Sequence, residues 1–195
     1  LLRIQAELHA DVDRQPDPAR WGHEVAISLM PWQPVVDGDV LPARPIDRIA
    51  AWAGAGVDVL VGTNTDEHRM FLVTSGAIDQ VTSEALAGVV TTYGLPVQPT
   101  LAAYRVAHPG AGLGDLLAAI QTDWYWRIPA MRLADAHATT ASTTYMYEFA
   151  WPSPVLDGRL GACHALEIPF VFDTLDLGHK QMLGGALGQN PPQHL

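Results

Sequence analysis

A histidine and a glutamate are the residues whose types and local settings best fit catalysis. His164 precedes a short apolar run at residues 165–172, which also carries Glu167. Glu67 closes the polar stretch 64–67 (NTDE), which follows an apolar segment. An imidazole can act as a general base near neutral pH, and a carboxylate on its other nitrogen orients it and stabilises its protonated form. The two stretches therefore supply an acid and a base for a nucleophile.

Each of these residues also has a purely structural explanation. A glutamate in a loop is most often a solvated surface acid. A lone histidine beside an apolar run is most often a packed side chain whose hydrogen bonds are satisfied. Glu67 and His164 lie far apart in the chain, so the pattern alone does not pair them.

An α/β fold with a parallel sheet is the predicted class, because strands and helices alternate along the chain. Residues 57–62 (VDVLVG) are rich in β-branched side chains and bounded by glycines, which predicts a strand buried on both faces. Residues 64–67 then lie at its carboxyl end, where open α/β sheets place their chemistry. Residues 143–149 (TTYMYEF) are the clearest strand, and residues 22–30 are a weak strand candidate.

Helices are predicted from amphipathic spacing, cap residues and boundaries at glycine or proline. They are expected at residues 1–10, 46–55, 82–93, 100–107, 113–124 and 130–138. Pro129 is expected to break or kink the chain between the last two. Proline-containing residues 11–20 and 31–45 are predicted loops, and residues 183–195 resemble a loop that stops before its next element.

Composition excludes several classes of function. The net charge is −10 and 48% of the residues are hydrophobic, which is a globular composition. An acidic chain without runs of Lys or Arg lacks the electrostatic footprint of a protein that binds nucleic acid or an anionic membrane, so neither is an expected partner. The single cysteine, Cys163, excludes an internal disulfide and a cysteine-based zinc site, and it fits a reducing compartment such as the cytoplasm.

Other arrangements of reactive residues are weaker. Cys163 adjoins His164, but adjacent side chains seldom meet in the geometry of a catalytic dyad, so a small buried residue is the better interpretation. No histidines have the spacing of metal ligands. Residues 124–126 (WYW) could line a substrate gorge. Consecutive residues face different ways on a helix, so at most one or two of them can do so, and core packing is favoured.

Several motifs together carry a family resemblance. They are residues 34–42 (PVVDGDVLP), 59–67 (VLVGTNTDE), 122–123 (TD), 129–130 (PA), 132–134 (RLA), 147–149 (YEF) and 164–172 (HALEIPFVF). With these motifs in this order, the chain resembles the C-terminal part of a type-B carboxylesterase. That is the α/β-hydrolase family of bacterial carboxylesterases and cholinesterases. The likeness covers nearly the whole chain.

The resemblance implies a serine esterase that acts on a small-molecule carboxylic ester and needs no metal or organic cofactor. It implies that Glu67 is the acid and His164 the base of the catalytic triad, in the hydrolase order Ser, Asp/Glu, His. One departure is His68, which stands where the family often has a glycine after the acid.

The nucleophile itself is missing from the sequence, because no serine lies in a G-x-S-x-G motif and no oxyanion loop of the HGGG type is present. We therefore expect residues 1–195 to form a single domain that is an incomplete α/β-hydrolase fold. The serine and the oxyanion hole are expected in a missing N-terminal part of the same protein that precedes Leu1. The isolated chain is then expected to be inactive.

Two alternatives stay open. One is a non-catalytic, cholinesterase-like binding protein or an inactive fragment, although the presence of both Glu67 and His164 argues against it. The other is a free-standing binding module. An incomplete parallel sheet would leave an apolar edge and faces uncovered, which argues against that reading.

Overall fold

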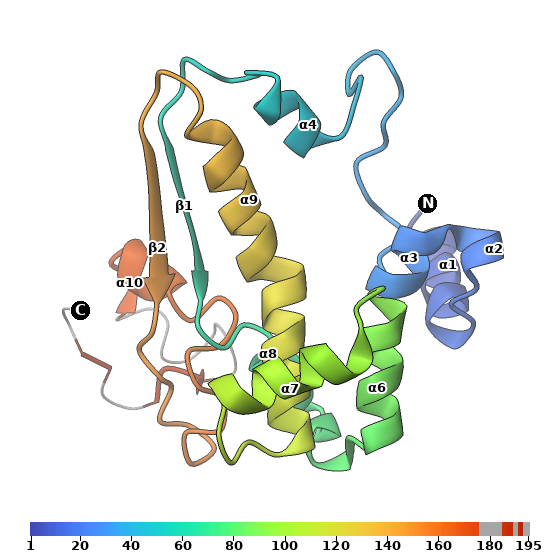
Figure 1. The fold of residues 1–195 in the computed structure, drawn as a ribbon, viewed down its shortest axis with the longest axis vertical. Coiled ribbons are helices and arrows are strands. Elements are labelled where there is room, and N and C mark those ends of the chain that lie inside the picture. The colour runs from blue at the N-terminus through green and yellow to red at the C-terminus, as the bar shows by residue number, and fades with distance from the viewer. Residues whose placement is uncertain (176–184, 189–190, 193–195) are drawn as a thin grey trace.

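The computed structural model of the chain describes residues 1–175, 185–188 and 191–192. Its centre is a pair of strands, β1 (Val59–Asn64) and β2 (Thr144–Phe149), which lie beside helix α9 (Ile128–His137) (Figure 1). The strands pair in parallel, with Val59 opposite Thr144 and Asn64 opposite Phe149. The two predicted strands and their parallel arrangement are thereby confirmed.

The prediction that the first strand is buried on both faces is wrong. β1 begins two residues later than expected, and Leu60 in its middle is 69% exposed. Within the described residues the sheet consists of β1 and β2 alone, so neither of its outer edges pairs with another strand. The apolar side chains of the strand are therefore less buried by the described part of the chain than the composition of the strand predicts.

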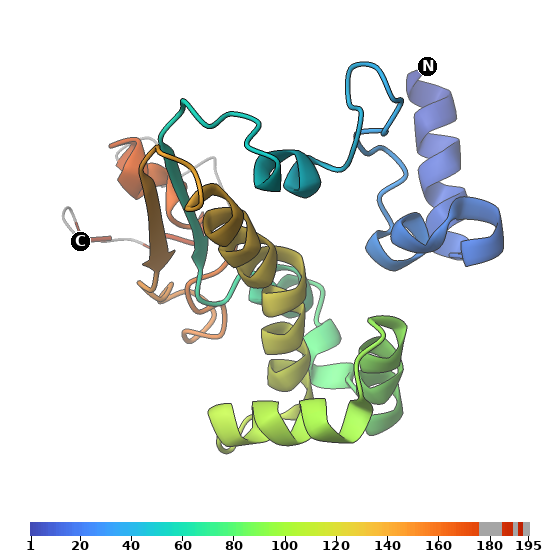
Figure 2. The ribbon, with the colours of Figure 1, turned by 45° about the horizontal axis from the view of Figure 1, so that its top comes forward.

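A single helical column runs along the sheet and beyond it (Figures 1 and 2). It consists of α8 (Leu113–Thr122), a π-helical turn (Asp123–Arg127) and α9 (Ile128–His137). The chain passes through Pro129 without a break, because proline is tolerated in the first turn of a helix, and the wider π turn lies immediately before α9. The expected interruption is thus a local widening of one continuous column.

An apolar core surrounds α8, the lower end of this column in Figure 1. Helices α6 (Ser83–Thr92) and α7 (Val97–Ala107) pack against α8 there. The Thr82 side chain accepts a hydrogen bond from the Ala85 amide, so Thr82 caps the start of α6, which lies within the helix predicted at residues 82–93. The buried members of this core are Leu86, Val90, Tyr93, Leu101, Leu116, Leu117 and Ile120.

The N-terminal segment is more helical than predicted. The helix predicted at residues 1–10 is α1 (Leu2–Arg14), which runs four residues further than expected. Helices α2 (Pro18–Trp21) and α3 (His23–Ser28) lie where a loop and a weak strand were expected. Tertiary contacts explain why residues 23–28 are helical. Ile27 packs against the core that α6, α7 and α8 share, and its carbonyl accepts a hydrogen bond from the Tyr125 hydroxyl at 3.0 Å. Side-chain packing therefore overrides a weak local preference for strand.

The remaining elements are short. They are α4 (Pro45–Ala50), α5 (Arg69–Thr74), the 3₁₀ helix η1 (Ala77–Gln80) and α10 (Ile168–Val171). Most of the predicted loop at residues 183–195 lies outside the described residues. No helix in the described ranges is both long and apolar enough to cross a membrane.

Gly114 in α8 lies against η1 with no room for a side chain, and it gives a stability prediction. A Cβ atom built there would lie 1.9 Å from the backbone oxygen of Ile78 in η1. We expect Gly114→Ala to destabilise the fold by about 1–3 kcal/mol, because rigid backbone has to move. Gly88→Ala, inside α6 with nothing near its Cβ, is the control and should stabilise by roughly 0.5–1 kcal/mol. Thermal unfolding of both variants measures the difference, and equal shifts would contradict the packing.

Candidate active site

The fold brings Glu67 and His164 into direct contact. His164 Nδ1 lies 2.7 Å from Glu67 Oε2. Glu67 follows the end of β1, and His164 lies in the loop after β2, so parallel pairing of the strands delivers both to one edge of the sheet. Glu67 is 5% exposed, whereas the His164 side chain is 44% exposed and can reach a ligand. Glu67 is therefore not a solvated surface acid, and His164 is not a fully packed histidine.

Both oxygens of the Glu67 carboxylate accept hydrogen bonds. Oε1 accepts from the Asn64 backbone amide at 2.8 Å, and Oε2 faces His164 Nδ1. An ionised carboxylate accepts only, so the hydrogen of this contact sits on Nδ1 of the imidazole. Nε2 of His164 then keeps a lone pair when the ring is neutral, which is the tautomer that a general base requires.

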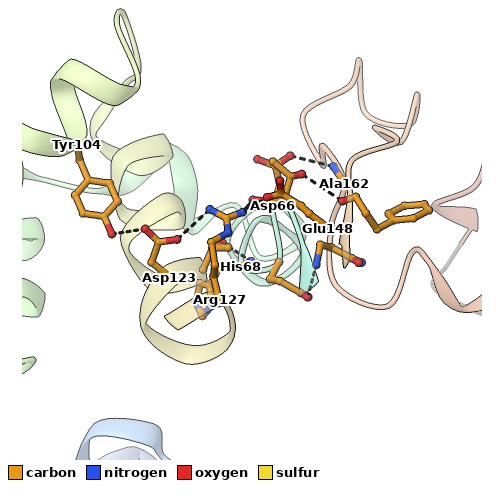
Figure 3. Close-up of polar contacts among 12 residues, drawn as sticks. Asp66, His68, Tyr104, Asp123, Arg127, Glu148 and Ala162 are labelled. Carbon is orange, nitrogen blue, oxygen red and sulfur yellow. Dashed lines mark hydrogen bonds and ion pairs between the residues drawn. The ribbon is translucent and has the colours of Figure 1, made fainter. Parts of the chain in front are cut away.

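Backbone and side-chain hydrogen bonds join the two loops that carry the pair. Asp66 donates its amide to the Ala162 carbonyl at 3.0 Å, and the Ala162 amide donates to Asp66 Oδ2 at 3.0 Å (Figure 3). Next to them the His164 amide donates to the Glu67 carbonyl at 3.3 Å. Gly161 permits this approach: its φ is +60°, and a Cβ there would lie 2.3 Å from Asp66 Oδ2.

Asn64, the last residue of β1, also links these loops. It is 1% exposed, and its Nδ2 donates to the Cys163 carbonyl at 2.7 Å and to Glu167 Oε2 at 2.6 Å. Glu167 therefore pairs with Asn64. The sequence placed Asn64 in the polar turn but gave no sign of this role, because its partners lie about a hundred residues downstream.

Arg127 joins the π turn to both strand ends, and sequence reasoning also missed it. Its guanidinium donates to the Thr65 carbonyl at 3.0 Å, to Asp123 at 3.0 Å and to Glu148 at 2.7 Å (Figure 3). Asp123 also accepts from the Tyr104 hydroxyl at 2.6 Å. These contacts fix the backbone that precedes Glu67.

Two histidines at the site have opposite pKa shifts. The hydrogen bond to Glu67 raises the pKa of His164 above its ordinary value of 6.5, against the opposing effect of burial. Burial lowers the pKa of His68 to about 4, and the positive charge of a protonated His164 acts in the same direction. At neutral pH the ring of His68 is therefore uncharged.

Cys163 is unsuited to nucleophilic attack. It is 0% exposed in a core with Leu160 and Leu166, and burial raises the pKa of its thiol to about 11. A thiol in such surroundings stays protonated and inert at neutral pH. The sequence interpretation of Cys163 as a small buried residue is confirmed.

An apolar cavity of about 430 Å³ lies next to the Glu67–His164 pair. Phe71 and Trp126 form part of its wall, and each ring centroid lies 5.6 Å from the ring of His164. Tyr125 lines it as well, whereas Trp124 instead stacks on Tyr93 at 4.3 Å. Two of the three residues at 124–126 thus line a cavity, the upper limit that helix geometry allowed. The preferred core packing holds for Trp124 and Tyr125, which both pack against the core of α6, α7 and α8.

The Asn64 contacts predict a large stability effect. In Asn64→Ala, the Cys163 carbonyl and the Glu167 carboxylate lose a buried donor, so we expect a loss of about 1–3 kcal/mol in the free energy of unfolding. Gln98→Ala, at an exposed position of α7, is the matched control and should change stability by less than about 0.5 kcal/mol. Urea unfolding compares the two. An Asn64 variant as stable as the control would show that these bonds contribute nothing net.

Comparisons with known proteins give matches to both the sequence and the structure of this chain. A sequence profile described as the carboxylesterase family matches residues 6–183. The para-nitrobenzyl esterase of Bacillus subtilis is 32% identical over 85% of this chain, and the phenmedipham hydrolase of Pseudarthrobacter oxydans is 28% identical over 73%. Human neuroligin-2 is 29% identical over 92% of this chain.

A solved structure matches the fold as well. The crystal structure of the carboxylesterase EST55 of Geobacillus stearothermophilus at pH 6.2 superposes with a TM-score of 0.67 and 31% identity, over 87% of this chain. The matched region is 35% of that structure's chain. The alignments cover 32%, 28% and 23% of the three relatives above, so the chain spans about a third or less of their length.

Proposed function

Because the chain belongs to the carboxylesterase family, we propose that it supplies the acid and the base of a serine esterase that hydrolyses small-molecule carboxylic esters. Its fold is a partial α/β-hydrolase fold with a short parallel sheet and helices, like that of its structural neighbours. The family and fold class predicted from the sequence are confirmed. The esterase activity is our proposal.

One observation carries the proposal, namely the 2.7 Å contact between His164 Nδ1 and Glu67 Oε2. Glu67 is buried with both oxygens occupied, while the side chain of His164 is 44% exposed. This is the arrangement in which a carboxylate holds an imidazole in the tautomer that accepts a proton at Nε2. A merely structural ion pair does not require an exposed imidazole.

In the proposed reaction, a serine from a segment outside these 195 residues attacks the carbonyl carbon of the ester. His164 Nε2 takes the hydroxyl proton as the new C–O bond forms, and the Glu67 carboxylate stabilises the resulting imidazolium. The tetrahedral intermediate collapses, and the leaving alkoxide takes the proton from Nε2. Water then repeats the sequence on the acyl-serine and releases the carboxylic acid.

A non-catalytic binding protein is the second candidate. The similarity to neuroligin-2 over 92% of the chain shows that a relative whose name does not describe an esterase or hydrolase shares this region. The paired Glu67 and His164 favour the esterase, because a binding surface does not need a buried carboxylate aligned with an accessible imidazole.

The test uses the complete product of the gene that encodes this chain. We expect it to hydrolyse a para-nitrobenzyl ester, the type of ester named for the Bacillus subtilis relative, and to be labelled by a fluorophosphonate, which reacts with activated serines. Peptide mapping should place the label on a serine outside the 195 residues. A product without hydrolysis and without a labelled serine would overturn the proposal and favour the binding protein.

A further inference from the structure

His68 places a polar ring in the wall of the apolar cavity. Its ring stacks on Tyr125 with centroids 5.7 Å apart and an interplanar angle of 12°. It also contacts Phe71 at 5.2 Å and Trp126 at 5.3 Å. Aromatic neighbours on several sides fix the orientation of the imidazole, so its nitrogens point in defined directions.

The ring nitrogens of His68 are unsatisfied in the described part of the chain. Nδ1 is fully buried and has no hydrogen-bond partner there. A buried N–H without an acceptor is rarer than a buried lone pair without a donor, so we assign the hydrogen to Nε2. No described residue accepts a hydrogen bond from Nε2. Nε2 also differs from Nδ1 in not being fully buried, so a ligand can reach it. It is a free donor on a residue that lines the cavity.

The cavity suits an aromatic ligand. Its volume of about 430 Å³ falls in the range of small-molecule sites, roughly 300–1,000 Å³. Rings of Phe71, Tyr125 and Trp126 offer stacking and edge contacts to another ring. Phe71 and Trp126 also contact His164. One part of an ester can therefore occupy the cavity while its carbonyl group lies beside the base.

We propose that His68 is a specificity-determining residue, which donates a hydrogen bond from Nε2 to an acceptor oxygen on the aromatic group of an ester bound in the cavity. The inference rests on the proposed function, because it deepens the substrate class of the same site. A buried donor that is left unpaired by one ligand and paired by another discriminates between them, whereas apolar walls alone discriminate weakly.

The test compares two alcohols that differ in one non-hydrogen atom, para-acetylbenzyl alcohol and para-isopropylbenzyl alcohol. The acetyl group places an acceptor oxygen where the isopropyl group has a methyl. Titration calorimetry with the complete gene product gives the ratio of their Kd values. We expect His68→Phe to shift that ratio against the acetyl compound by about threefold to tenfold, the loss of one neutral hydrogen bond.

His68→Gln separates this role from a structural one, since its amide restores an N–H donor of similar reach and should return the ratio toward the wild-type value. The ring ¹⁵N signals of His68 should also move with the acetyl compound and not with the isopropyl compound. An unchanged ratio in His68→Phe, a ratio that Gln does not restore, or no binding at millimolar alcohol would each overturn the inference. Neither alcohol is an ester, so the result is independent of whether the protein hydrolyses esters.

Discussion

His164→Ala should remove nearly all esterase activity from the complete protein, by a factor on the order of 10⁶ in kcat. Without the imidazole, no group accepts the serine proton, and the leaving alkoxide finds no donor at Nε2. The neighbouring His68 does not replace it, because its low pKa makes it a weak base and Nδ1 is buried. Steady-state hydrolysis of a para-nitrobenzyl ester measures the loss.

His9→Ala is the matched control for this substitution. His9 is an exposed histidine on α1, and its contact with Asp13 is a surface ion pair, so its removal should leave both kcat and stability close to wild type. If His164→Ala kept more than about a hundredth of the activity while remaining folded, His164 would not be the base.

Glu67→Gln should lower kcat by about 10⁴-fold with little change in the fold. The amide is nearly isosteric with the carboxylate, but its NH₂ group donates to His164 Nδ1. That forces the imidazole hydrogen onto Nε2, where the base needs a lone pair. It also removes the negative charge that stabilises the imidazolium in the transition state. Single-turnover rates compared with wild type report the chemical step directly.

The pH profile distinguishes this role from a structural one. His164 works as a neutral base, so activity falls as the pH drops below the pKa of His164. Glu67 raises that pKa above 6.5 in the wild type. In Glu67→Gln the imidazolium loses its partner, so the acid limb of kcat/KM should move to lower pH. A limb that stays in place would show that Glu67 does not control the ionisation of His164.

The local chemistry of the chain was readable from the sequence alone. The β-branched run at residues 57–62 and the β-branched and aromatic run at residues 143–149 predicted the two strands. The helix predicted at residues 82–93 contains α6, since these signals act over a few residues. The motifs from residues 34–42 to residues 164–172, taken together and in order, indicated the family, which the profile match shows. The N-terminal helix α3 was not predictable, because its conformation depends on packing against the distant core that contains Tyr125.

Tertiary structure alone decided how these residues meet. The parallel register of β1 and β2 sets Glu67 beside His164, and no local pattern encodes a pairing across so many residues. The same holds for Asn64 and Arg127, whose donors reach partners on other elements. The sequence by itself determined which residues can do acid–base chemistry, since that depends on side-chain type. Their distances, burial and pKa shifts depend on what the folded chain places around them, so only the structure decided those.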